Sequence, residues 1–428
     1  MRVLVVDTNR QPLDPCHPAR ARKLLGKGRA AVYRRYPFTI LLKDRTVEKS
    51  VVHPYRIKID PGSKITGFAV LNEETGQVIW AAELTHRGQQ IRDALLTRRM
   101  LRRRRRSRKT RYRAPRFLNR RRPQGWLPPS LMSRVVNTIT WVKRLMRFCP
   151  VTAISQELSK FDTQALENPE ISGVEYQQGT LHGYEAREYL LQKWGRRCAY
   201  CRGEKVPLAV EHITPRSKGG SNRISNLTLA CHACNESKGS QLIEEFLARK
   251  PDLLEQITSQ AKVPLKDAAA INATRWELFQ QLQNCGLPVE YSTGGRTKFN
   301  RVQRHLPKTH WLDAACIGTS TPEQLYLRGV HPLLMRATGH GVRQRCRTDK
   351  FGFPHRHAPR AKKFFGFQTG DIVVADIPTG KLAGRYIGRV VIRFRPSFRL
   401  NGINVHPKYL RVIHHADGYD YTQRAVTS

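Results

Sequence analysis

Two Cys-x-x-Cys pairs carry the clearest chemistry in this sequence. Cys198 and Cys201 form the first pair, Cys231 and Cys234 form the second, and the 29 residues 202–230 separate them. Four thiolates at this spacing suit tetrahedral Zn²⁺ and leave no coordination position open, so we expect a structural zinc site. The alternative, a chance pairing of core cysteines, is disfavoured by two correctly spaced pairs. The total of nine cysteines is odd and lacks a disulfide framework, which favours a reducing cytoplasm.

A string of His, Asn and acidic residues, 210–239, lies between and just after these pairs. Phosphodiester hydrolysis needs an imidazole to accept a proton from water and oxygen ligands to hold a divalent cation. A lone His beside a Glu is more often a surface pair, so the interpretation depends on the whole string. This string closely resembles the HNH nuclease family. The resemblance implies that His212 is the general base, that Glu211 and Asn235 bind Mg²⁺ or Mn²⁺, and that Asn226 holds the loop bearing the base. Glu211 stands where the family more often has Asp.

Three acids occupy suggestive places far apart in the chain. Asp60 and Glu157 each end a segment that alternates like a strand, and Asp313 follows His310 by one helical turn. Each acid alone is more often solvated than catalytic. Together they resemble the RuvC-like branch of the RNase H fold. The resemblance implies that the three carboxylates hold two Mg²⁺ or Mn²⁺ ions about 4 Å apart, and that His310 is the catalytic His of the group.

Arginine dominates residues 98–122, with an unbroken run at Arg102, Arg103, Arg104, Arg105 and Arg106. Guanidinium groups bind phosphates with two hydrogen bonds and stack on exposed bases, so this run suits an RNA partner. The alternative is a solvated or nuclear-targeting basic run. Lys and Arg outnumber Asp and Glu by 76 to 33, and a formal charge of +43 calls for a polyanionic partner. No apolar run is long enough for a bilayer or a signal peptide, so we expect no membrane partner.

Alternating and periodic segments predict the elements that must position these residues. Strands are expected at 55–60, 67–71 and 77–84, joined by short turns into an antiparallel meander. A helix at about 133–148 should then lead to the strand 151–157 that carries Glu157.

The two ends of the chain predict separate accessory domains. The basic N-terminal segment, to about Pro54, should contain a Pro-rich turn at 12–15 and a strand at 38–42. Short alternating strands at 371–376 and 386–392 are typical of a small β-barrel.

The order of these segments is more specific than either nuclease motif. The arginine stretch lies between Asp60 and Glu157, and the HNH string lies between Glu157 and Asp313. This order resembles the CRISPR type II effector nucleases, in a chain too short for their recognition lobe. The whole chain more closely resembles the transposon-encoded IscB family. Pro12–Pro15 reads Pro-Leu-Asp-Pro where that family has Pro-Leu-Met-Pro.

The fold that the resemblance implies is multidomain α/β: a split RuvC-like core with an inserted bridge helix and an inserted ββα-metal HNH domain carrying a zinc knuckle, followed by a small β-barrel-like domain. The implied domains are an N-terminal Pro-Leu-Met-Pro-type domain at 1–54, RuvC-like segments at 55–96, 123–184 and 246–325, an Arg-rich bridge helix at 97–122, an HNH nuclease domain at 185–245 and a C-terminal domain at 326–428.

The resemblance also implies an RNA-guided double-strand DNA endonuclease. Its guide and scaffold RNA would be encoded at the same locus, and Arg102–Arg106 would contact the guide. The HNH site would cut the guide-paired target strand, and the RuvC-like site would cut the displaced strand. The C-terminal domain would contact RNA and a target-adjacent motif. We expect a monomer in a ribonucleoprotein, in a prokaryotic cytoplasm and at the nucleoid when on target.

Two other functions remain open from the sequence. A stand-alone HNH endonuclease of homing or restriction type, without guide RNA, explains residues 198–235 but not the split triad or the arginine stretch. A non-enzymatic RNA-binding or transposon-accessory protein with a purely structural zinc explains the charge. It leaves the catalytic-type positions without a role.

Overall fold

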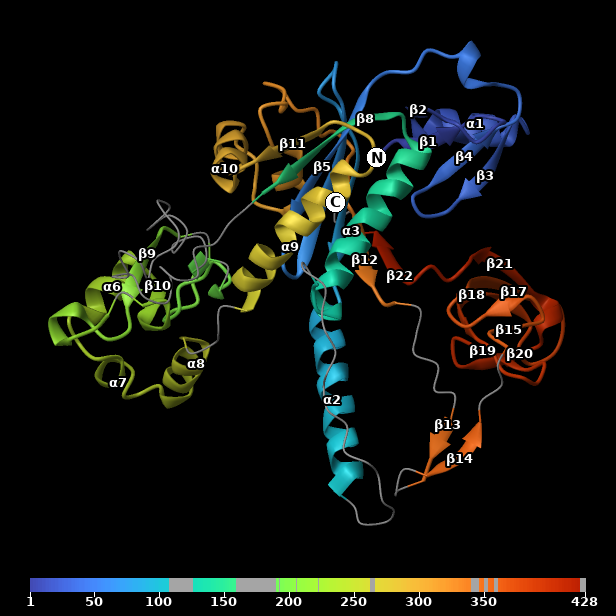
Figure 1. Cartoon of the computed structure of the whole chain (residues 1–428). Helices are drawn as coiled ribbons and strands as arrows, with labels where there is room; N and C mark the ends of the chain where they lie inside the picture. The colour runs from blue at the N-terminus through green and yellow to red at the C-terminus, as the bar shows by residue number, and fades with distance from the viewer. Residues whose placement is uncertain are drawn as a thin grey trace. The chain divides into compact units, whose positions relative to one another are not determined.

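The computed structural model of the protein divides into two compact units, Met1–Leu158 with Thr274–Ser428, and Ser159–Ala273 (Figure 1). No helix among the described residues is long and apolar enough to cross a membrane. The residues that the structure describes are 1–107, 126–158, 190–191, 193–204, 206–221, 223–261, 266–339, 346–349, 353–357 and 361–423.

A seven-stranded sheet of order β11-β8-β5-β6-β7-β12-β22 is the centre of the first unit (Figure 1). The predicted meander is confirmed: β5 pairs antiparallel with β6, and β6 with β7. β8 runs parallel to β5 on the side away from β6. The strands are β5 (Tyr55–Pro61), β6 (Ile65–Asn72), β7 (Val78–Thr85), β8 (Val151–Glu157), β11 (Val289–Ser292), β12 (Leu333–Ala337) and β22 (Tyr419–Gln423).

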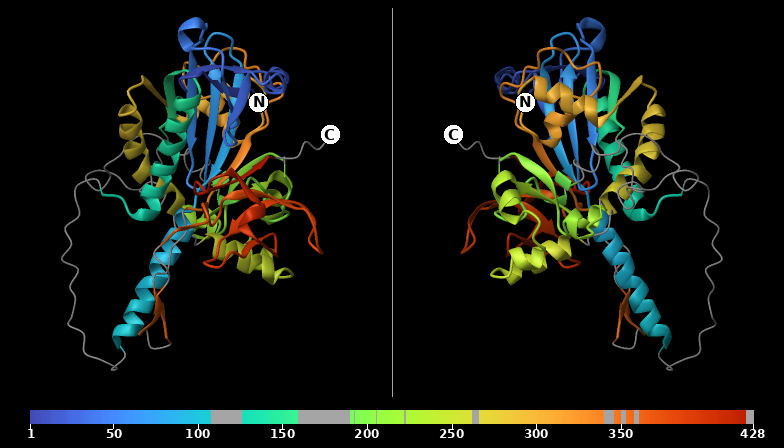
Figure 2. Two further views of the ribbon diagram at one scale, coloured as in Figure 1. Left: turned by 90° about the vertical axis from the view of Figure 1, so that its right-hand side faces the viewer. Right: turned by 90° about the vertical axis from the view of Figure 1, so that its left-hand side faces the viewer.

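Helices cover both faces of this sheet, and successive side chains of β5 point alternately to one face and the other. Ile57 and Ile59 are fully buried in the main hydrophobic cluster, so Lys58 and Asp60 point to the opposite face. The main cluster includes residues of α3 (Pro129–Phe148) and α9 (Lys266–Gln283), which lie on the same side of the central strands (Figure 2). On the opposite face a small-residue cluster joins β6 to α11 (His310–Ala315). The other helices of this unit are α1 (Pro18–Gly26), α2 (Gly88–Ser107) and α10 (Gly294–Gln303), with 3₁₀ turns at Val47–Lys49 and Pro407–Tyr409.

The N-terminal segment forms its own sheet of order β2-β1-β4-β3. The turn predicted at 12–15 is wrong, because these residues lie in β2, an edge strand. An edge strand tolerates proline since a missing N–H there can face away from the partner strand. Asp14 accepts a hydrogen bond from the backbone N–H of His53 (3.0 Å) and also contacts its ring, which joins the edge strand to the segment leading into β5. The strands are β1 (Val3–Val6), β2 (Pro12–Cys16), β3 (Ala30–Arg34) and β4 (Thr39–Leu42).

The C-terminal part contains a five-stranded antiparallel sheet of order β20-β19-β18-β17-β21 around Phe398 and Val390. Closure into a barrel stays a prediction. β12 and β22, which we expected within the C-terminal domain, pair with each other in the central sheet instead. The strands are β17 (Ile372–Ile377), β18 (Gly384–Val391), β19 (Phe398–Leu400), β20 (Ile403–Val405) and β21 (Leu410–His414), with two-stranded pairs β13 (Cys346–Thr348) with β14 (Pro354–His357) and β15 (Lys363–Phe364) with β16 (Phe367–Gln368).

The second unit is a hairpin followed by helices. Its strands pair antiparallel, with His212 opposite Leu227 and Leu208 opposite Cys231. Its core extends to Ile257, beyond the boundary at 245 that the sequence suggested. The elements are β9 (Leu208–His212), β10 (Leu227–Cys231), α6 (His232–Lys238), α7 (Ile243–Phe246) and α8 (Pro251–Ala261), with 3₁₀ turns at Arg216–Lys218 and Ile224–Asn226.

Candidate active sites

The end of β5 and the start of α11 bring two of the predicted residues of the first unit together. His310 Nδ1 lies 3.1 Å from the Asp60 carboxylate, although 250 positions separate the two residues in the chain. Burial lowers the pKa of His310, but the hydrogen bond with Asp60 and the charges of Asp60, Glu83 and Asp313 outweigh burial and raise it. The imidazole is therefore held in one orientation, and its protonated form is stabilised relative to that of a free histidine.

Asp313 lies in the same short helix and is buried. Arg301 of α10 pairs with it, with Nε 2.7 Å from a carboxylate oxygen. Burial, with the negative charge of Asp60, raises the pKa of Asp313 to about 6 against the opposing charges of Lys308, Arg301 and His310. Asp60 and Asp313 therefore repel each other as like charges in a partly dry site.

Glu157 is the last residue of β8 and is paired with Ser292 of β11. Ile154 faces the main cluster, so the alternation of the strand puts Glu157 on the opposite face, the one that also carries Asp60. Three carboxylates on one face fit divalent cations, because a cation offsets their mutual repulsion. The carboxylate oxygens of the three acids do not all lie within 4.8 Å of one another. Among the described residues, only the four cysteines form a group with ligand atoms so close together.

Glu83 is a fourth acid on this face that sequence reasoning missed. Across the meander Asp60 pairs with Gly67, and Gly67 pairs with Glu83, so the three residues form one row. Glu83 Oε1 accepts a hydrogen bond from the backbone N–H of Trp311 (3.4 Å). The predicted meander could have revealed this acid, because the pairing of its three strands places Glu83 in the same row as Asp60, two strands away.

The second unit holds Glu211 in a buried ion pair. Lys238 of α6 is completely buried and its Nζ lies 2.7 Å from Glu211 Oε1, while the Tyr200 hydroxyl donates to Oε2 at 2.7 Å. Burial and the charge of Glu211 raise the pKa of Tyr200. Because both oxygens of Glu211 have a donor, this arrangement does not fit a metal ion bound by Glu211. That role stays a prediction.

His212 follows Glu211 at the end of β9, and side chains hold both its own backbone and the segment after it. Lys238 Nζ donates to the His212 carbonyl oxygen at 2.9 Å. Asn226 accepts from the Thr214 N–H at 2.8 Å and donates to the carbonyl oxygens of Thr214 and Ser221. These contacts tie the segment that follows His212 to Asn226. Asn235 is half-buried on α6.

The four predicted zinc ligands converge in the second unit. The sulfur atoms of Cys198, Cys201, Cys231 and Cys234 all lie within 4.8 Å of one another, and Cys201 Sγ is 3.7 Å from Cys231 Sγ. A tetrahedral site with Zn–S bonds of about 2.3 Å has sulfur–sulfur edges of about 3.8 Å. Burial raises the pKa of Cys198, but backbone N–H donors at Cys201, Cys231 and Tyr200 lower it to about 7. The residues fit a structural Zn²⁺.

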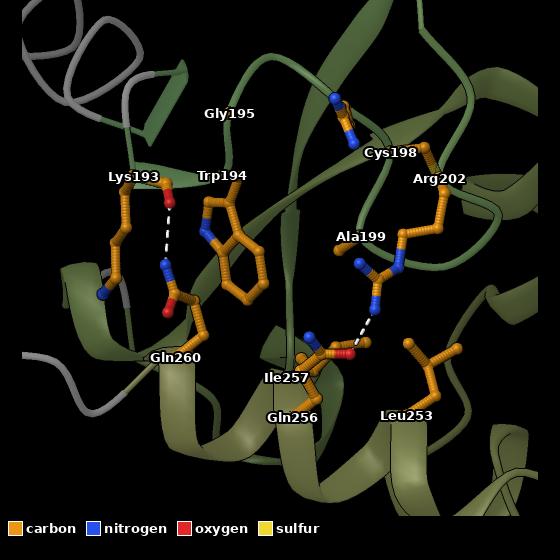
Figure 3. A pocket seen from close by; sticks show the side chains of 11 residues that line it. Lys193, Trp194, Gly195, Cys198, Ala199, Arg202, Leu253, Gln256, Ile257 and Gln260 are labelled. Atoms are coloured by element: carbon orange, nitrogen blue, oxygen red, sulfur yellow. Dashed lines mark hydrogen bonds between the residues drawn. The ribbon is translucent and has the colours of Figure 1, made fainter. Parts of the chain in front are cut away.

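A cavity of about 330 Å³ lies beside this cysteine cluster, against α8 (Figure 3). Gln260 donates to the Lys193 carbonyl oxygen at 2.8 Å, and Arg202 donates to Gln256, so both walls of the cavity are tied to α8. Neither Glu211 nor His212 lines it. The cavity is therefore lined by one of the candidate zinc ligands, Cys198, and not by the candidate catalytic residues Glu211 and His212.

The arginine stretch begins in a helix. Arg102–Arg106 lie in α2, which starts at Gly88, ten residues before the arginine-rich stretch, and Arg102, Arg103 and Arg104 are exposed. Leu96, Met100 and Leu101 on the same helix are exposed as well. Residues 108–125, which include the rest of the stretch, lie outside the described residues.

Two family models match the chain. One, described as RRXRR protein, matches residues 3–179, and one, described as HNH endonuclease, matches residues 198–251. A comparison with curated proteins found no match.

Solved structures of Cas9 are among the structural matches. Streptococcus thermophilus Cas9 in complex with the GGAA PAM matches at 12% identity and a TM-score of 0.23 over 61% of this chain and 32% of its own. The Type II-C Cas9 from Actinomyces naeslundii matches at 13% identity and a TM-score of 0.17 over 69% of this chain and 45% of its own. The chain thus spans about a third to under half of the Cas9 chains that it matches. The chain thus contains a region that matches the RRXRR model and a second region that matches the HNH endonuclease model.

Proposed function

We propose that this chain is an RNA-guided double-strand DNA endonuclease with two nuclease centres, one RuvC-like and one HNH. The contact between Asp60 and His310 carries the proposal, because it joins segments on either side of the HNH-bearing unit. A stand-alone HNH enzyme has no need for an acid–histidine site assembled in this way. The RuvC-like segments would be those expected from the sequence within 55–96, 123–184 and 246–325, except that the HNH domain, expected at 185–245, would continue past 245 to include Ile257.

In the RuvC-like centre, Asp60, Glu157 and Asp313 would hold Mg²⁺ or Mn²⁺. When bound, the metal would activate water and offset charge on the phosphate. Asp60 orients the His310 imidazole through Nδ1, as carboxylates orient histidines at many sites. A protonated His310 would donate a hydrogen bond to the phosphate or to the leaving oxygen. This centre would cut the displaced strand.

In the HNH centre, His212 would accept the proton of the attacking water. Its backbone is held by Lys238, and the following loop is held by Asn226, so the imidazole is presented from a fixed turn. The cysteine cluster, with Zn²⁺ bound, would brace the hairpin from its other end, where Cys231 closes β10. This centre would cut the strand paired to the guide.

The RNA partner is supported by charge and by exposure. The chain carries a formal charge of +43, and Arg102–Arg104 are exposed on α2. Arginines along an exposed helix can bind successive phosphates of a guide. The guide and scaffold RNA would come from the locus that encodes the chain, and base pairing would supply the sequence recognition.

The test is to express the gene with its native flanking DNA, purify the protein and sequence the RNA bound to it. We expect one discrete RNA from the adjoining locus, with one variable end that serves as the guide. Heterogeneous host RNA that moderate salt removes would contradict guidance.

The stand-alone HNH endonuclease is the second candidate. It is supported by the second unit, which is compact by itself and contains the four cysteines together with Glu211, His212, Asn226 and Asn235. If Asp60→Ala leaves cleavage of both strands unchanged, this candidate is favoured.

A further inference from the structure

The seat of α11 on the meander explains how its residues reach Asp60. Gly67 of β6 lies directly under the start of this helix. A Cβ at Gly67 would lie 1.9 Å from the carbonyl oxygen of His310, closer than any real side chain can approach. The helix therefore rests on the backbone of β6, between Asp60 on one neighbouring strand and Glu83 on the other.

The first turn of α11 has amide groups that the helix itself does not satisfy. The Thr309 hydroxyl accepts from the Leu312 N–H at 3.4 Å, and the Thr309 carbonyl oxygen accepts from the Asp313 N–H at 2.9 Å. The Trp311 N–H is left for Glu83, whose Oε1 accepts it at 3.4 Å. Glu83 thus ties the first turn of α11 to β7 by a side-chain hydrogen bond.

We propose that Glu83 is a positioning residue of the RuvC-like centre. By accepting the Trp311 N–H, its carboxylate fixes the first turn of α11 over Gly67. This placement sets His310 and Asp313 beside Asp60. The role of the site as a nuclease rests on the proposed function, but the contact that Glu83 makes does not.

Three variants test this role: Glu83→Ala removes the acceptor, Glu83→Gln keeps an acceptor oxygen without the charge, and Glu74→Ala is the matched control. Glu74 is an exposed acid in the turn between β6 and β7. Each full-length protein is loaded with RNA and given DNA labelled separately on its two strands. Nicking of the displaced strand is measured against nicking of the paired strand, which reports on folding. Hydrogen exchange of residues 308–316 is measured on the same samples.

For Glu83→Ala we expect displaced-strand nicking to fall by about 10-fold or more, as for residues that orient metal-site ligands. Exchange at residues 308–316 should be faster, with the paired-strand nick unchanged. Glu83→Gln should restore both readouts, and Glu74→Ala should match the wild type. Unchanged exchange in Glu83→Ala would overturn the proposal. A loss in Glu83→Gln as deep as in Glu83→Ala would also overturn it, because the charge and not the contact would then matter. If the wild type cuts no DNA, the proposed function fails, but the exchange measurement still decides the role of Glu83.

Discussion

The charge of Asp313 depends on its surroundings. It is buried beside Asp60, and Arg301 offsets only part of the resulting repulsion, so its pKa rises to about 6. Without a cation, the ionised form of Asp313 is therefore electrostatically unfavourable in the folded protein. A bound divalent ion would remove that strain, which is why the same environment suits a metal ligand.

This strain predicts how stability depends on pH. Because the folded pKa of Asp313 lies above its unfolded value of 3.8, its contribution is present below about pH 4 and is lost as the pH rises through about 6. In EDTA, Asp313→Asn should remove this loss and stabilise the protein at pH 7.5. The gain should be at most about 3 kcal/mol, since one pKa unit corresponds to about 1.4 kcal/mol. Unfolding by denaturant between pH 4 and 8 checks this, and identical pH profiles for both proteins would contradict it.

Single residues of the site were predictable to different degrees. Asp60 ends an alternating strand, and His310 and Asp313 share one helical turn, so a family resemblance could select them from the sequence. Glu83 was not found, because its role depends on the pairing of β6 with β7 and on the bare backbone at Gly67. The Lys238 contact with Glu211 was equally hidden, since a lysine near the end of a short helix is usually solvated.

At the scale of elements, the hairpin β9–β10 and helix α6 are joined by the buried pair of Glu211 and Lys238. Lys238 also donates to the His212 carbonyl oxygen, so its side chain connects α6 both to the Glu211 carboxylate and to the His212 backbone. Removing one member of a buried ion pair leaves the other charge without compensation.

Lys238→Met should therefore lower the free energy of unfolding of this unit by about 3–5 kcal/mol. Glu211→Gln combined with Lys238→Met should recover most of that loss, because no buried charge remains and the amide oxygen of the new side chain can still accept from Tyr200. Denaturant unfolding of the single and double variants measures the difference. A double variant no more stable than Lys238→Met would show that the ion pair is not the cause.

The cysteine cluster gives a second prediction at this scale. Cys201→Ser should lose the bound zinc, about one ion per chain, and should unfold the hairpin, because Cys231 ends β10 and Cys234 lies on α6 directly after it. Paired-strand nicking should disappear while displaced-strand nicking persists. Cys285→Ser is the control, because Cys285 donates to the Gln281 carbonyl oxygen, a contact that serine can keep. Zinc content and strand-specific cleavage measure both, and full zinc content in Cys201→Ser would contradict the assignment.

Elements with a clear alternation were predictable, and those that depend on neighbours were not. The first strand of the meander agrees with the sequence pattern because apolar and polar residues alternate along 55–60, although the structure covers both faces of that strand. Pro12–Pro15 looked like a turn because proline is rare in strands, whereas its place at the edge of a sheet is a tertiary fact. The return of β22 to β12 joins distant segments, which no local pattern reports.

At the scale of the whole molecule, charge dominates. An excess of 43 positive charges implies that many phosphates are neutralised when RNA binds, each with release of counterions. The affinity for RNA should therefore fall steeply with salt, with a log–log slope that corresponds to many phosphate contacts. Titrations between about 50 and 200 mM salt measure this slope. A slope equal to one or two contacts would contradict a scaffold RNA.

Strand-specific cleavage tests the central claim most directly. The protein is loaded with its RNA, supplied with Mg²⁺ and given a matched target labelled on each strand, as wild type, Asp60→Ala and His212→Ala. We expect the wild type to cut both strands, Asp60→Ala to nick only the guide-paired strand, and His212→Ala to nick only the displaced strand. If Asp60→Ala still cuts both strands, or if cleavage does not depend on a match to the RNA, the account of two RNA-guided nuclease centres is wrong.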